Sequence, residues 1–211
     1  MRPLTKALLA GGGALFAGWV GWGIYSSREA ESVPYERLRT LNGVEIRQYP
    51  RTILVETTAP DQRRAFRRLF EYISGDNRGG ESISMTAPVQ TRNGESISMT
   101  APVRSETAAT DTDAVRMGFY LPAEYGPETA PEPTASDVSL VTEPAKRVAV
   151  DRFSWYAPAW RVERRTRKLL STLEREGVEP VGDPYLLRYD DPWTPPFMRR
   201  NEAAVAVAET D

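Results

Sequence analysis

Residues 80–89 read GESISMTAPV, and residues 94–103 read GESISMTAPV again. In the first copy Ile83, Met85 and Ala87 are separated by serine or threonine, and the second copy repeats the pattern. Period-two alternation of this kind predicts a half-buried β-strand in each copy. Because proline cannot donate a hydrogen bond to a neighbouring strand, each strand should end at the proline of its copy, lie at a sheet edge or contain a bulge.

The segment between the two copies predicts how they are joined. Residues 92–94 are Arg-Asn-Gly, and Asn-Gly is a strong signal for a β-hairpin. A two-residue turn would place the two Ile/Met/Ala sets on opposite faces, since a shift of one residue reverses the facing of a strand. A three-residue loop over 92–94 instead pairs Val89 with Ile97 and places both sets on one face. One apolar face is easier to bury than two, so we predict the three-residue loop.

A helix is predicted just before the doubled phrase, over about residues 62–74. Asp61 is the expected N-cap and Gly75 the expected end. The apolar positions follow the spacing i, i+3, i+4, i+7, which predicts one apolar stripe along the helix. That stripe consists of Phe66, Leu69, Phe70 and Ile73.

The whole chain reads as strands, a helix and two strands, followed by the same order again. The second helix is expected over about residues 158–176, and Asn42-Gly43 predicts a further hairpin. Two similar halves favour an α+β domain, with an antiparallel sheet, two main helices and pseudo-twofold symmetry. The other expected strands are 35–41, 44–49, 52–58, 115–121, 137–141, 147–156, 184–189 and 202–208.

Composition excludes several classes of function. The 211 residues are 40% hydrophobic and 27% charged, with a formal net charge of −2, so no concentrated positive charge favours nucleic acid. The chain contains no cysteine and no histidine, which excludes disulfides, thiolate metal sites, cysteine nucleophiles and the usual general base. No nucleophile–base pair or phosphate-binding loop is recognisable, so we do not expect an enzyme.

The N-terminal residues predict a membrane anchor. Residues 7–25 carry no charge and, as a helix, would span roughly 30 Å of hydrocarbon. Arg2 and Lys6 precede them, so the remaining domain should lie on the extracytoplasmic side. The alternative is a cleaved signal peptide. We therefore divide the chain into an anchor or signal segment with its linker, residues 1–30, and a binding domain, residues 31–211.

Three segments carry a resemblance to a known family. They read YERLRTLNGVEIRQYP from residue 35, FRRLFEYISGDNRGGESISMTAPV from residue 66, and YDDPWTPPFMRRNEAAVAV from residue 189. Together they resemble the SOUL haem-binding protein family, from about Tyr35 to Val207. The resemblance implies a distorted, barrel-like α+β fold of two related halves. It also implies reversible, non-catalytic binding of haem or another tetrapyrrole in a shallow apolar cleft.

The same resemblance implies where such a ligand would bind. In similar proteins the haem-contacting surface lies on the first helix and near the C-terminal turn, which by position corresponds to Arg63, Phe66, Phe70 and Trp193. A tetrapyrrole needs a flat apolar surface together with a cation for each propionate, and these residues supply both.

The absence of histidine separates this chain from family members that ligate iron through that residue. Tyr72 is the candidate axial ligand nearest the expected cleft, whereas Met85 and Met99 are expected in the sheet. Weak ligation would favour capture of haem or free porphyrin over oxygen chemistry.

Two other functions stay open from the sequence. The two-halved fold also resembles bacterial effector-binding domains, so the ligand could be another amphipathic small molecule or a protein partner. A buried glutamate facing the cleft would favour a cationic ligand, and an arginine-rimmed aromatic cleft would favour a tetrapyrrole. A membrane-anchored scaffold without a ligand would lack a cleft beside the first helix.

Overall fold

The structure is a computed structural model that describes residues 31–93, 114–190 and 194–209. The predicted anchor and linker, residues 1–30, lie outside these ranges. In the three described ranges no helix is both long and apolar enough to cross a bilayer. The predicted anchor therefore stays a prediction.

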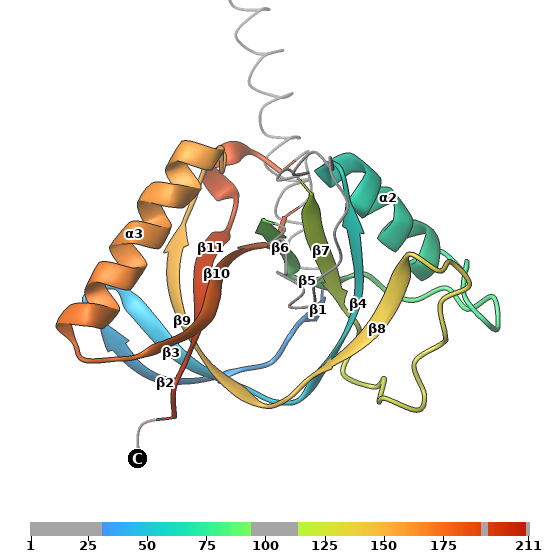
Figure 1. The fold of residues 1–211 in the computed structure, drawn as a ribbon, viewed down its shortest axis with the longest axis horizontal. Coiled ribbons are helices and arrows are strands. Elements are labelled where there is room, and N and C mark those ends of the chain that lie inside the picture. The colour runs from blue at the N-terminus through green and yellow to red at the C-terminus, as the bar shows by residue number, and fades with distance from the viewer. Residues whose placement is uncertain (1–30, 94–113, 191–193, 210–211) are drawn as a thin grey trace, which may run out of the picture.

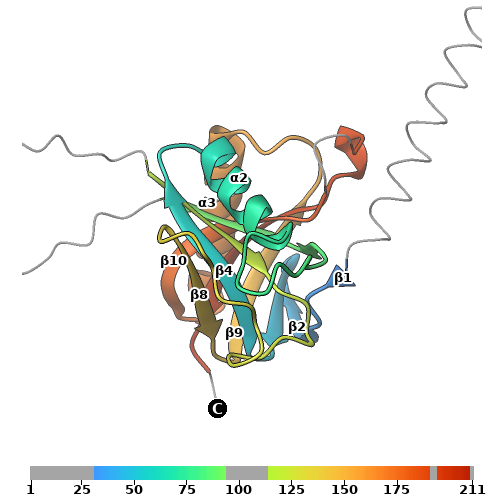
Figure 2. The same cartoon turned by 90° about the vertical axis from the view of Figure 1, so that its right-hand side faces the viewer.

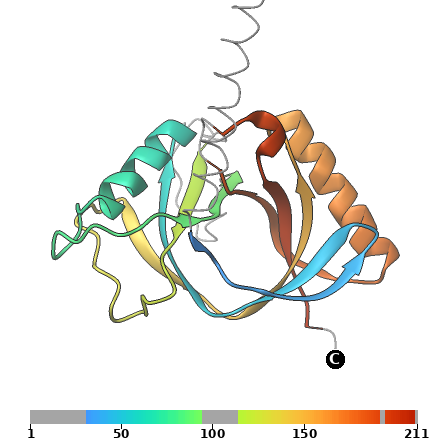
Figure 3. The ribbon, with the colours of Figure 1, turned by 180° about the vertical axis from the view of Figure 1, so that it is seen from behind.

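One antiparallel sheet of nine strands forms the body of the domain. It curves so strongly that the ribbon resembles an open barrel, with helices α2 and α3 outside it on opposite sides (Figures 1 and 3). The strand order is β2-β3-β9-β11-β10-β6-β7-β4-β8. The strands are β2 (Glu36–Leu41), β3 (Val44–Tyr49), β4 (Thr52–Ala59), β6 (Val89–Asn93), β7 (Val115–Tyr120), β8 (Val138–Glu143), β9 (Lys146–Phe153), β10 (Pro180–Arg188) and β11 (Asn201–Val207).

Two short strands, a 3₁₀ helix and two α-helices complete the described chain. A two-stranded parallel sheet pairs β1 (Glu31–Ser32) with β5 (Thr86–Ala87). A 3₁₀ helix, η1 (Pro196–Met198), precedes β11. Helix α2 (Gln62–Ile73) packs on β4 and β7, as Figure 2 shows for β4, and helix α3 (Ala159–Arg175) packs on β9, β10 and β11. Each helix thus covers its own part of the sheet, and the predicted α+β fold with two helices is confirmed.

Alternation along the strands divides the core into three layers. In β4, Val55 packs under α2, whereas its neighbour Leu54 points into the curve of the sheet. In β9, Ala149 packs under α3, whereas Val148 points inward. Successive strand side chains face opposite ways, so one strand supplies two layers. Burial of both faces explains the near-continuous apolar runs of these strands.

The first half of the chain follows its local signals closely. Asn42 and Gly43 have φ of +47° and +84° and form the two-residue turn between β2 and β3. Asp61 caps α2, because its Oδ1 accepts the Arg64 backbone N–H at 2.9 Å. The helix ends at Ile73, two residues before Gly75. The predicted hairpin and the predicted cap are both confirmed.

The buried face of α2 is rotated from the predicted stripe. Leu69 and Ile73 are buried as expected, but the other buried positions are Ala65 and Tyr72. Phe66 and Phe70 are 40% and 49% exposed. Both phenylalanines are therefore accessible at the surface of α2, and neither is buried core packing. A stripe wider than the contact with β4 and β7 leaves one of its edges at the surface.

The doubled phrase does not form the predicted hairpin in its described part. Only Thr86 and Ala87 of the first copy's alternating run are strand residues, and Met85 is 38% exposed. The chain passes Pro88 and continues as β6, so a strand does end at this proline. Residues 92 and 93 belong to β6 and not to a loop. The second copy, including Met99, lies outside the described residues.

Strand pairing gives the physical reason for this correction. β6 lies between β10 and β7, so both of its edges already have hydrogen-bonding partners. Val89 pairs with Phe119 on one side and Arg188 on the other, which leaves no edge for Ile97. The Asn-Gly signal was local, whereas the pairing was decided by distant strands.

Candidate ligand-binding cavity

A cavity of about 530 Å³ lies beside the first turns of α2. The segment leading into β5, the loop between β9 and α3, the end of β10 and the residues after η1 form its other walls. Its volume falls within the range of typical small-molecule pockets. A scaffold without a ligand was expected to lack a cleft beside the first helix. The presence of this cavity therefore does not fit that alternative.

Aromatic and apolar side chains make up much of this cavity. Phe66 and Trp155 line its mouth, where both are partly exposed to solvent. Phe66 meets the buried Phe119 ring edge-on, with 5.3 Å between the ring centroids. Val89 and Met117 add aliphatic and thioether surface from β6 and β7. A flat apolar ligand would therefore find aromatic faces held in place by the core.

Arg188 gives the cavity a cation that has no carboxylate partner among the described residues. Its Nη1 donates to Gln62 Oε1 at 3.2 Å, and no described carboxylate lies within ion-pair distance of its guanidinium. Burial lowers the pKa of Arg188, since a charged group loses hydration there. Arginine nevertheless keeps its charge in proteins. A partly buried, unpaired guanidinium is stabilised by an incoming anion.

Two of the four predicted site residues line the same cavity as Arg188. Arg63 and Phe66 line the cavity. Phe70 does not line it, but its ring stacks on Phe66 with 6.0 Å between centroids and so extends the aromatic surface outward. Trp193 lies outside the described residues.

Tyr72 does not reach the cavity. Its side chain is buried on the far side of α2, where its hydroxyl donates to the Pro131 carbonyl oxygen at 2.7 Å. Burial raises its pKa to about 12, which opposes the phenolate form that a metal would need. The expectation that Tyr72 is the axial candidate nearest the cleft is therefore wrong. The orientation of α2 on the sheet leaves Phe66 exposed and buries Tyr72 in the core.

The position of Met85 also differs from the prediction, but unlike Tyr72 it lies at the cavity and not away from it. It was expected inside the sheet, but it precedes β5 and lines the cavity. Its thioether, together with that of Met117, places sulfur at the cavity wall. Methionine is a known haem ligand in other proteins.

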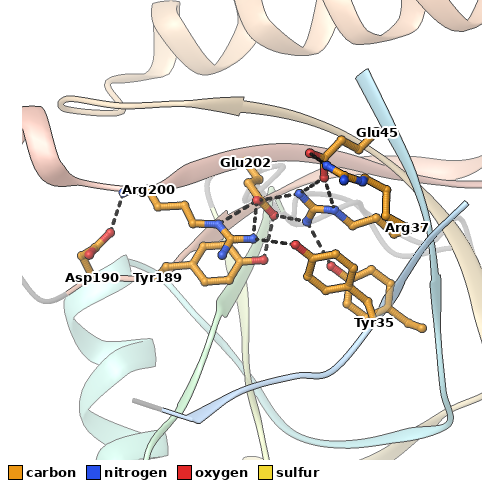
Figure 4. Close-up of polar contacts among 9 residues, drawn as sticks. Tyr35, Arg37, Glu45, Tyr189, Asp190, Arg200 and Glu202 are labelled. Atoms are coloured by element: carbon orange, nitrogen blue, oxygen red, sulfur yellow. Dashed lines mark hydrogen bonds and ion pairs between the residues drawn. The ribbon is translucent and has the colours of Figure 1, made fainter. Parts of the chain in front are cut away.

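A buried charge network stands behind the cavity wall (Figure 4). Glu202 is fully buried and accepts hydrogen bonds from Arg47 Nη1 at 2.8 Å and Arg200 Nε at 2.8 Å. The Tyr189 hydroxyl donates to the same carboxylate at 2.7 Å. Arg200 and Tyr189 also line the cavity, whereas Glu202 does not. The network therefore fixes two wall residues without offering the carboxylate to a ligand.

The ionisation of Glu202 follows from these contacts. Burial alone would raise its pKa, but hydrogen bonds and charge from Arg47, with the charge of Arg200, outweigh burial and hold the pKa below its ordinary value. Arg47 is 1% exposed and also pairs with Glu45 at 2.6 Å. Asp190 accepts the Arg200 backbone N–H and so orients the start of β11.

The sequence reasoning missed Arg188, Trp155 and Met85. Arg188 is a single arginine at the end of a strand, and no local pattern marks it. Trp155 could have been noticed as an aromatic residue beside the Pro158 that precedes a helix. All three come together only because β10, β9 and the β5 segment meet in the folded domain.

A comparison with protein families matches residues 30–206 to the family described as SOUL heme-binding protein. The chain belongs to this family. SOUL membership confirms the resemblance found in the three sequence segments, and it supports a haem or tetrapyrrole ligand in general terms. No curated protein matches the sequence.

Solved structures show where the SOUL-family fold recurs. The EcmrR C-terminal domain aligns with a TM-score of 0.52 at 12% identity, over 83% of this chain and 99% of that chain. An uncharacterized conserved protein from Listeria innocua gives 0.51 at 13%, over 85% and 94%. A hydrolase from Listeria innocua gives 0.52 at 15%, over 80% and 93%. Identities this low show a shared fold only.

Proposed function

We propose that the cavity binds haem or an iron-free porphyrin reversibly and without catalysis. The observation that carries the proposal is Arg188, a partly buried guanidinium without a carboxylate partner among the described residues, which lines an aromatic cavity. A tetrapyrrole with propionates combines a flat apolar ring with anionic groups. Family membership points to the same ligand class.

Each part of such a ligand has a matching group in the cavity. Arg188 and Arg63 are the residues that would hold the propionates through charge-assisted hydrogen bonds. Phe66 and Trp155 would flank the ring at the mouth, and Val89 would contact it from the sheet. A cationic ligand is less suited, because Asp190 is the carboxylate that the described wall contains, and it already accepts a backbone N–H.

Iron would add little to affinity in this site. The chain has no histidine or cysteine, and the wall offers the thioethers of Met85 and Met117. When bound, haem supplies an iron centre, and Met85 is the residue that would contact it from the mouth. We therefore expect hemin and protoporphyrin to bind with similar affinity, and Met85→Leu to alter the hemin spectrum alone.

Titration of the protein with hemin and with protoporphyrin tests the proposal. The expected result is a Soret shift for hemin and quenched tryptophan fluorescence for both ligands at micromolar concentration. No spectral change with either ligand at that level would overturn the proposal.

Arg188→Met removes the charge but keeps an unbranched side chain. Loss of one charge-assisted contact should weaken binding about 10- to 100-fold, from about 1.5–3 kcal/mol. Arg152→Met is the matched control, since Arg152 is an exposed strand arginine that does not line the cavity. Protoporphyrin dimethyl ester, which lacks free carboxylates, should bind both variants equally. If Arg188→Met weakened binding of the ester as much as binding of protoporphyrin, Arg188 would act through folding and not through the propionates.

A further inference from the structure

We propose that the surface around the cavity mouth docks on an anionic lipid bilayer, so that the cavity faces the membrane. The aromatic rim of this surface is defined by the partly exposed side chains Phe66, Phe70, Trp155, Tyr156, Trp160 and Phe197. The proposal concerns a second partner of the domain and holds for any ligand in the cavity.

The rim is one surface contributed by three separate elements. Phe66 and Trp155 line the same cavity from α2 and from the segment before α3. The Trp155 N–H donates to the Pro196 carbonyl oxygen of η1 at 2.8 Å, and the Arg199 guanidinium lies 4.8 Å from the centre of the Tyr156 ring. The starts of α2 and α3 and the η1 segment lie along one edge of the domain in Figures 1 and 3.

The exposure of this rim is held by the backbone. Trp155 has φ of +73°, a left-handed conformation that bulky residues rarely adopt. Its carbonyl oxygen accepts the Asn201 Nδ2 donor at 2.8 Å, so both polar groups of its backbone are fixed. Trp160, the second residue of α3, is 63% exposed. Strain that keeps a large aromatic side chain in solvent points to a partner surface.

Charge around the rim favours an anionic partner. Arg63 and Arg67 on α2, and Arg161, Arg164 and Arg167 on α3, have no carboxylate within ion-pair distance in the described part of the chain. Glu163 is an acidic residue among the cations of α3. By contrast, Arg165 and Lys168 share one carboxylate, Asp151, at 3.2 and 2.7 Å. Tryptophan and tyrosine mixed with arginine is the composition of membrane-interface surfaces.

The place where the chain enters the domain selects a bilayer over an acidic protein. β1 begins at Glu31 and runs parallel to β5, with Glu31 opposite Thr86. Thr86 and Ala87 line the cavity, so the 30 preceding residues connect to the domain beside it. Those residues include the uncharged stretch 7–25. A chain held in a bilayer by that stretch would keep the cavity close to lipid.

Single-cysteine labelling tests the proposal in the full chain, which contains no native cysteine. Ser154→Cys places an environment-sensitive fluorophore beside Trp155, and both Ser154 and Ser171 are exposed serines. Ser171→Cys is the matched control, roughly 16 Å along α3 from Trp160. Both proteins are reconstituted in vesicles of phosphatidylcholine with or without phosphatidylglycerol.

The expected result is a blue-shifted label at position 154 that doxyl lipids quench in phosphatidylglycerol vesicles, with an unchanged label at 171. Neutralising Arg161 and Arg164 to glutamine should shift the docking equilibrium roughly fivefold per charge. Trp160→Ala should also reduce quenching, and added salt should weaken it. A label at 154 that behaves like the one at 171 would overturn the proposal. A label at 154 that is blue-shifted but is not quenched by doxyl lipids would also overturn it, in favour of cover by the chain itself or by a protein.

Discussion

Glu202→Gln probes the charge network behind the cavity with almost no change in side-chain shape. Glu202 is fully buried and balances Arg47, which is 1% exposed, as well as Arg200. The amide removes the negative charge but leaves both guanidinium groups in place. Glu45 is then the one described carboxylate that still pairs with Arg47.

The size of the effect follows from burial. Removing one partner of a buried ion pair costs about 3–5 kcal/mol, because the remaining charge stays desolvated. For a domain of this size that corresponds to a Tm lower by roughly 6–20 °C. Glu45→Gln is the matched control: Glu45 pairs with the same Arg47 at 2.6 Å, but its side chain is 26% exposed. Water can solvate Arg47 where the Glu45 charge is lost, so the free energy of unfolding should fall by about 1 kcal/mol or less.

Urea unfolding followed by circular dichroism measures both variants. The midpoint should fall strongly for Glu202→Gln with an unchanged slope, and only slightly for Glu45→Gln. The double variant Arg47→Met/Glu202→Leu should recover part of the loss, since paired apolar residues can replace a buried ion pair. Equal midpoints for the two single glutamine variants would refute the reasoning, because burial would then not decide the cost.

Three further outcomes follow from the same structure. The folded-state pKa of Glu202 lies below its unfolded value of 4.5, so its contribution is complete above that pH and is lost as pH falls through the folded pKa. The gap between the wild-type and Glu202→Gln urea midpoints should therefore narrow from about pH 7 to about pH 3.5, and a constant gap would contradict this. Asp61→Ala removes the side-chain acceptor for the Arg64 backbone N–H and should lower the free energy of unfolding in urea by about 0.5–2 kcal/mol. Asp183→Ala, in an exposed segment of β10, is the control. Gly118→Ala would bring a Cβ to 3.0 Å from Leu54 Cδ2, a fully buried side chain, and should cost about 1–3 kcal/mol; an unchanged midpoint would show that this contact relaxes freely.

Predictions that depend on neighbours in sequence succeeded. Asn42-Gly43 forms its turn because the required backbone angles belong to those two residues. Asp61 caps α2 because its acceptor and the Arg64 donor are three residues apart. The α+β class followed from the order of such elements. The assignment of Arg63 and Phe66 to ligand binding stays a prediction, although both side chains line the cavity.

Predictions that depend on distant partners failed or were missed. The phrase repeated at residues 80–89 and 94–103 indicated a hairpin, yet β6 is enclosed by β7 and β10, and β10 lies about a hundred residues further along the chain. The stripe on α2 gave the correct period but not the rotation that buries Tyr72. That rotation depends on the shape of the sheet beneath the helix.

The sequence by itself determined the turns, the helix cap, the α+β class and the family, because these depend on backbone preferences and on order along the chain. The tertiary structure decided the partners of β6, the exposed side of α2 and the meeting of Arg188 with Trp155 and Phe66. It also decided that Arg47 and Glu202, 155 residues apart, bury their charges together. Pairing and burial are set by competition among all surfaces of the folded chain, and no local segment contains that information.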